Sequence, residues 1–135
     1  MFKLLKILNS GVNVPEPVRL PVTASTNFKI GSALTISSGK LANCTATTLP
    51  KYIAAQDLTA GEATDMLVYP ITDGMIFATK FSVTPTSIVV GNKVTLALES
   101  SIAVGVTATT TSGVAEIYNL NGASAAGDTV EVIFR

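Results

Sequence analysis

The chain contains two copies of one short segment. Residues 30–36 read Ile-Gly-Ser-Ala-Leu-Thr-Ile, and residues 90–96 read Val-Gly-Asn-Lys-Val-Thr-Leu. Each copy continues into an Ala-Thr-Thr cluster and a glycine-containing loop, and each closes on an Asp and an alternating strand, at residues 65–71 and 128–134. A solenoid needs about three or more repeats to bury a continuous core. Two copies therefore predict two β-rich halves that pack against each other.

Tight turns separate the predicted strands. Ser38-Gly39 lies between two alternating runs and predicts a β-hairpin, and Asp73-Gly74 predicts a second one. Gly31 and Gly91 each precede a predicted strand, where a tight turn or bulge needs a positive φ. β-branched residues dominate the runs, and they suit a half-buried pleated surface. Short strands at this spacing are typical of a barrel or a sandwich.

The domain prediction follows from this pattern. We expect an all-β fold, a small β-barrel or sandwich in one domain at residues 21–135. Its two similar halves are predicted at about residues 28–81 and 88–135, and an extended N-terminal arm at residues 1–20. A chain of 135 residues is long enough for one modest core.

The N-terminal arm combines an apolar start with a proline-rich continuation. Pro15, Pro17 and Pro21 enforce extended geometry, so this stretch is not expected inside a sheet. Two interpretations remain open: the apolar start folds back on its own domain as an edge strand or short helix, or it docks on a neighbouring subunit. The second is favoured, and it predicts that deleting residues 1–14 leaves the domain folded but abolishes attachment to the partner. The predicted partner contacts of the arm are Phe2, Leu4, Leu5, Ile7, Leu8, Val12 and Val14.

Composition argues against several classes of partner. Charged residues make up 13% of the chain, against about 25% in a usual soluble domain, and nine basic residues balance nine acidic ones. Without a net charge there is no long-range field to attract nucleic acid or an anionic membrane, so neither is expected as a partner. Lys6 interrupts the apolar start. We therefore expect a protein made in the cytoplasm without a signal peptide.

No residue pattern predicts catalysis. The chain has no histidine, which is the commonest general base and metal ligand. The single cysteine, Cys44, is interpreted as a small buried residue. Asp57, Glu62 and Asp65 lie near one another in sequence but lack the ligand ladder of a calcium loop. Asp65 and Asp128 are interpreted as turn caps rather than a catalytic pair. We expect no enzyme activity, no catalytic residue, no cofactor and no metal.

Several of these segments together resemble the capsid decoration proteins of tailed bacteriophages, which are head-stabilising, auxiliary coat proteins. The resemblance rests on the Met-Phe-Lys-Leu-Leu-Lys opening, the proline-rich stretch, the repeated Ile/Val-Gly-x-x-Leu/Val-Thr strand and the closing Ala-Gly-Asp-Thr-Val-Glu-Val. It implies a small β-barrel that binds the outside of an expanded head, with the major capsid protein as its partner. It also implies a homo-oligomer, with a trimer favoured over a dimer or a monomer, and no enzymatic residues.

Two other functions remain as alternatives. An adhesive or glycan-binding β-module on a phage or cell-surface fibre would show exposed aromatic residues on a strand face or a bound calcium ion near residues 57–65. A small hydrolase would need Asp65 and Asp128 within about 10 Å of each other in one cleft.

Overall fold

The computed structural model describes residues 1–8 and 15–135, and the regular structure in this part of the chain consists of strands alone. Two of the predicted arm contacts, Val12 and Val14, lie outside the described residues. Within the described residues no helix is long and apolar enough to cross a membrane. The strands are β1 (Lys3–Ile7), β2 (Val18–Pro21), β3 (Ala33–Ser37), β4 (Lys40–Asn43), β5 (Tyr52–Ala54), β6 (Asp65–Pro70), β7 (Met75–Lys80), β8 (Lys93–Val94), β9 (Leu96–Glu99), β10 (Ile102–Val106), β11 (Ala115–Asn119) and β12 (Thr129–Phe134).

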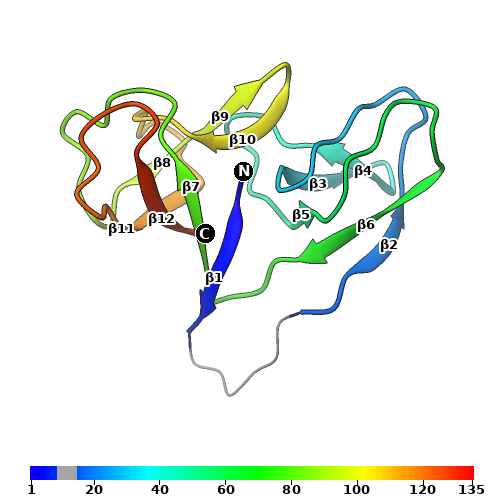
Figure 1. Ribbon diagram of the computed structural model, residues 1–135, viewed down its shortest axis with the longest axis horizontal. Helices are drawn as coiled ribbons and strands as arrows, with labels where there is room; N and C mark the ends of the chain where they lie inside the picture. The colour runs from blue at the N-terminus through cyan, green and yellow to red at the C-terminus, as the bar shows by residue number, and fades with distance from the viewer. Residues whose placement is uncertain (9–14) are drawn as a thin grey trace.

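The strands form two sheets. The first has the order β1-β7-β12-β11-β8, and the second has the order β2-β6-β5-β3-β10-β9, with β4 paired to β3. All of these ladders are antiparallel. Figure 1 shows β2 to β6 on one side and β7, β8, β11 and β12 on the other, with β1, β9 and β10 between them. The predicted all-β fold is confirmed. The sheets are not closed into a barrel, so the fold is consistent with the sandwich of the two predicted architectures.

The sequence repeat has a counterpart in the backbone of the two halves. The Gly31 N–H donates to the carbonyl of Ala54 at 2.8 Å, and the Gly91 N–H donates to the carbonyl of Ile117 at 2.9 Å. Gly31 has a φ of +75° and Gly91 a φ of +91°, as their positions before a strand predict. These bonds tie the repeated turn to β5 in one half and to β11 in the other, so the two copies fold alike.

The similar halves begin earlier than the sequence indicated. The Val22 N–H donates to the carbonyl of Thr64 at 3.0 Å, just beyond the β2–β6 ladder. The Phe81 N–H donates to the carbonyl of Asp128 at 3.1 Å, just beyond the β7–β12 ladder. β7 is therefore the counterpart of β2 and opens the second half. The sequence placed residues 75–81 in the first half, whereas β7 pairs with β12 and β1.

One of the two predicted hairpins forms. Ser38 and Gly39 join β3 to β4, and both have a positive φ, of +49° and +76°. The hairpin predicted around Asp73-Gly74 is wrong: the chain turns there, but β6 pairs with β2 and β5, whereas β7 lies in the other sheet. The Gly74 carbonyl accepts a hydrogen bond from Leu8 at 2.7 Å, and Ile71 donates to Lys51 at 2.9 Å, so partners from outside the turn hold the turn segment.

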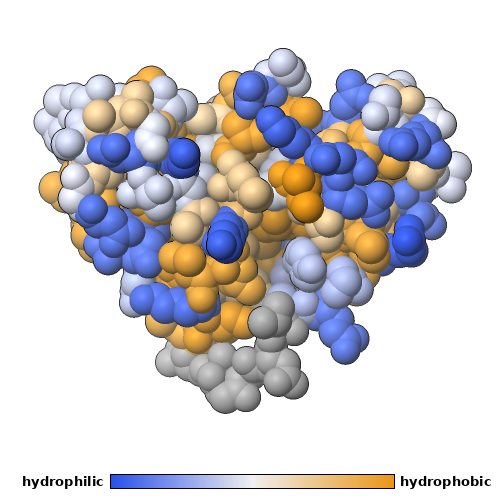
Figure 2. All heavy atoms as spheres, viewed as in Figure 1, coloured by the Kyte–Doolittle hydropathy of each residue, from blue (hydrophilic) through white to orange (hydrophobic). Residues whose placement is uncertain are grey.

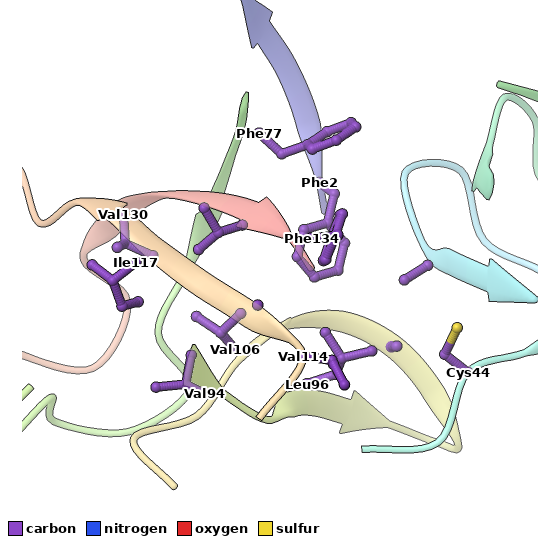
Figure 3. Packing of buried hydrophobic residues seen from close by; sticks show 14 of the residues in the cluster. Phe2, Cys44, Phe77, Val94, Leu96, Val106, Val114, Ile117, Val130 and Phe134 are labelled. Carbon is purple, nitrogen blue, oxygen red and sulfur yellow. The ribbon is translucent and has the colours of Figure 1, made fainter. Parts of the chain in front are cut away.

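The apolar core has two clusters. The smaller one lies within the first half and contains Leu34, Leu41, Met66 and Val68. The larger one is built mainly from the second half, but Phe2 and residues of the first half also belong to it. Figure 3 shows this larger cluster, with Cys44 at its margin and the rings of Phe2, Phe77 and Phe134 close together. The larger cluster therefore contains residues of the first half, of the second half and of the N-terminal segment.

A candidate apolar docking site between the two halves

The apolar start of the predicted arm is a strand of its own domain. β1 pairs with β7, with Lys3 opposite Ala78 and Ile7 opposite Met75. This is the fold-back interpretation that the sequence left open. Among the predicted arm contacts, Phe2 is 2% exposed, Leu4, Ile7 and Leu8 are half-buried, and Leu5 is 46% exposed.

Phe2 anchors β1 in the shared core. Its ring meets the ring of Phe134 edge-on, with centroids 5.2 Å apart, and Phe77 lies 5.3 Å from Phe134. The Phe2 N–H also donates to the carbonyl of Gly31 in the first half at 2.7 Å. β1 thus joins the β7 edge of the second half to the repeated turn of the first half. The expectation that residues 1–14 can be deleted without loss of folding does not fit this burial.

The N-terminal amino group lies at the same junction. It donates a hydrogen bond to the carbonyl of Val104, and the Met1 side chain lies over Gly31. Partial burial lowers the pKa of this amino group, and the positive charges of Lys29 and Lys80 lower it further. The start of the chain therefore lies near Lys29, Lys80 and the acidic Glu99, at the point where the two halves meet.

An apolar pocket opens beside this junction. It has a volume of about 250 Å³ and lies between β1, the repeated turn of the first half and the ends of β5 and β6. Its lining residues are Met1, Phe2, Lys3, Leu4, Pro15, Ile30, Gly31, Ile53, Ala54, Ala55, Tyr69, Pro70, Met75 and Phe77. Figure 2 shows hydrophobic residues gathered over β1 and around the space between the halves.

Three lining residues form an apolar rim that remains exposed to water. Met1 is 60% exposed, Ile30 46% and Tyr69 37%. Ile30 precedes the positive-φ Gly31, so the repeated turn carries its side chain at the surface. A partner that covers the pocket and its rim would gain roughly 25 cal/mol for each Å² of apolar surface removed from water. The arrangement can therefore bind an apolar group.

Sequence reasoning missed most of this pocket. Of the five predicted arm contacts that the structure describes, Phe2 and Leu4 line it, whereas Met1, Ile30 and Tyr69 were not predicted. The exposure of Ile30 could have been predicted from the sequence, because an apolar residue just before a turn glycine has no neighbouring strand to cover it. Its counterpart Val90 is likewise 61% exposed. The position of Tyr69 depends on which strands face each other, and no local pattern encodes that.

The acidic residues of the first half form separate contacts. Asp57 accepts a hydrogen bond from the Ile30 N–H at 2.8 Å, and Glu62 accepts one from the Thr59 N–H at 2.9 Å. Asp65 forms an exposed ion pair with Arg19 at 3.0 Å. No group of three or more metal-ligating side chains is found in the described part of the chain.

Asp65 and Asp128 do not have the same role. Asp128 caps a turn, as predicted: it accepts hydrogen bonds from the N–H groups of Ser124 and Ala125 at 2.8 and 2.9 Å. These bonds lower the pKa of the Asp128 carboxyl group. Asp65 lies inside β6 and pairs with Arg19, so its predicted capping role is wrong.

Cys44 matches its interpretation as a small buried residue. It is 1% exposed, and burial raises the pKa of its thiol to about 12. A thiol with so high a pKa carries almost no thiolate at neutral pH, and the thiolate is the reactive form.

Comparisons with known proteins give the chain no relative. No protein-family model matches it, and the searches of the curated proteins and of the solved structures found no match.

Proposed function

We propose that the chain is a structural virion protein that binds the outer surface of a phage capsid. It stabilises the expanded head by bridging subunits of the major capsid protein. In this proposal it has no enzymatic role, it is located on the capsid exterior, and it acts as a homo-oligomer, with a trimer favoured. The resemblance of its N-terminal, repeat and C-terminal segments to capsid decoration proteins is the starting point of the proposal.

The observation that carries the proposal is the apolar pocket with its exposed rim. Single exposed apolar side chains are normal on a protein surface, but a contiguous apolar patch next to a pocket is typical of a binding site. Here Met1, Ile30 and Tyr69 surround one pocket of about 250 Å³. Few charged residues interrupt the surface, since they make up 13% of the chain. A surface of this kind suits permanent contact with another protein.

The mechanism in this proposal is mechanical. Each copy places its pocket and rim on an apolar projection of the coat protein. A single contact of this size is weak, but many copies, or several contacts within one oligomer, act together. Such multivalent contact holds neighbouring coat subunits against the pressure of packaged DNA.

The test is binding to expanded heads of the phage that encodes the chain, produced without the gene for the chain. We expect the purified protein to sediment with these heads. Ile30→Lys and Tyr69→Lys should each weaken binding about ten-fold, because each places a charge in an apolar contact. Val83→Lys is the matched control, since Val83 is 45% exposed and Ile30 is 46% exposed, and Val83 lies outside the pocket. Failure of the unmodified protein to bind the heads would overturn the proposed function.

A further inference from the structure

The charges around the apolar pocket are unevenly distributed. Among the described residues that line it, the charged groups are the Met1 amino group and the Lys3 ammonium group, and both are cationic. Lys29 and Lys80 lower the pKa of the Met1 amino group, whereas Glu99, which pairs with Lys29, raises it. The pocket therefore combines apolar walls with a positively charged border.

The acidic residues nearest this border already have partners. Asp57 accepts a hydrogen bond from the Ile30 N–H at 2.8 Å, and Glu99 pairs with Lys29 at 3.6 Å. Lys3 has no ion pair within the described part of the chain. The Lys3 ammonium group is thus the cation of the pocket lining that an incoming carboxylate could pair with.

The apolar surface formed by the pocket and its rim favours a polypeptide segment over a small molecule as the ligand. The pocket, at about 250 Å³, lies just below the range of about 300–1,000 Å³ that is usual for small-molecule sites. A small ligand inside it would leave the exposed rim of Met1, Ile30 and Tyr69 in water. A chain segment that places one large side chain in the pocket and lies across the rim would cover both.

We infer that the pocket receives an acidic segment of the coat protein, in which one large apolar side chain is flanked by aspartate or glutamate. The apolar side chain fills the pocket, and the flanking carboxylate pairs with Lys3. This inference rests on the proposed function, because it names the chemistry of the segment that the coat protein would present. Complementary charge of this kind fixes the register of a segment and selects among partners more than it adds affinity.

The experiment uses overlapping synthetic peptides that cover the coat protein of the same phage, probed with the purified full chain. The bound peptides should contain an apolar residue with an acidic neighbour. For the tightest of them, Lys3→Glu should raise the dissociation constant about five-fold, in line with the energy of an exposed ion pair. Replacing the acidic residue of the peptide by lysine should restore the affinity for Lys3→Glu. Lys40→Glu is the control, because Lys40 is exposed and does not line the pocket.

The outcomes separate this inference from the proposed function. Head binding that is unchanged in Lys3→Glu, or peptide binding without any acidic neighbour, would overturn the inference and leave the proposed function standing. Head binding by a protein that binds no coat peptide would overturn the inference in the same way. A protein that does not bind heads at all would overturn the proposed function and the inference with it.

Discussion

The two halves protect the same sheet edge in different ways. In the second half, the outer edge of β7 is covered by β1. In the first half, β2 occupies the equivalent position and stands at the end of its sheet. The Phe81 N–H donates toward the β12 side and the Val22 N–H toward the β6 side, away from the outer edge of each sheet. Along an antiparallel strand the hydrogen-bonding direction alternates from one residue to the next, so every second residue faces the outer edge. The edge-facing residues are therefore Ile76, Ala78 and Lys80 in β7, and Pro17, Arg19 and Pro21 at β2.

The prolines account for this difference. An exposed sheet edge invites pairing with another chain, and proline blocks it because it has no N–H to donate. Pro17 and Pro21 occupy two of the three edge-facing positions at β2, on either side of Arg19. The equivalent edge of β7 keeps its N–H groups and uses them to hold β1. Of these two equivalent edges, the edge of β7 therefore pairs with a strand, whereas prolines block pairing at the edge of β2.

The largest effect is expected from Phe2→Ala. This change removes the anchor of β1 and leaves a cavity beside Phe134, so it should lower the free energy of unfolding by about 3–4 kcal/mol. Denaturant unfolding measures the change. Val18→Ala on β2 is the matched control, because Val18 is 39% exposed, and there the loss should stay below about 0.5 kcal/mol. Equal losses in the two variants would show that β1 does not contribute to the core.

A smaller difference is expected between Gly31→Ala and Gly91→Ala. Both glycines have a positive φ, so each substitution should cost about 1 kcal/mol of stability through backbone strain. A Cβ atom at Gly31 would also lie 2.1 Å from Cγ of Met1, whereas one at Gly91 would meet nothing within 4 Å. Gly31→Ala should therefore cost about 1 kcal/mol more than Gly91→Ala. Thermal unfolding of both variants tests this, and equal losses would contradict the position of Met1 over the turn.

The smallest effect concerns the hairpin turns of the two halves. The β3–β4 turn contains Gly39 at a φ of +76°, whereas the β9–β10 turn contains Ser101 at a φ of +65°. A non-glycine residue in this region is strained, so Ser101→Gly should stabilise the protein by about 0.5 kcal/mol. Gly39→Ala should destabilise it by about 1 kcal/mol. Melting temperatures that shift in the same direction for both variants would contradict this account of the turns.

Local features of the fold could be predicted from the sequence. The Ser38-Gly39 turn, the positive φ of Gly31 and Gly91, and the burial of Cys44 follow from residue type and spacing alone. The all-β class follows from the same patterns. Each of these features depends on a few neighbouring residues, which is why reasoning from the sequence reached them.

Features that depend on distant strands could not be predicted in this way. The turn at Asp73-Gly74 looks like a hairpin turn, but β7 finds better partners in β1 and β12. The apolar start is followed by a proline-rich stretch, and this favoured an arm docked on a neighbouring subunit over an edge strand of its own domain. The pocket is formed by parts of the chain that are far apart in sequence, so its rim could not be recognised before the strands were placed.

The central claim is that β1 is an integral strand of the second half, whereas no strand within residues 1–8 and 15–135 pairs with the equivalent edge of the first half. Amide hydrogen exchange followed by NMR tests it most directly, by comparing Ala78 on β7 with Arg19 on β2. We predict slow exchange at Ala78 and fast exchange at Arg19, with the protection at Ala78 lost in Phe2→Ala. Fast exchange at Ala78 in the unmodified protein would contradict the claim.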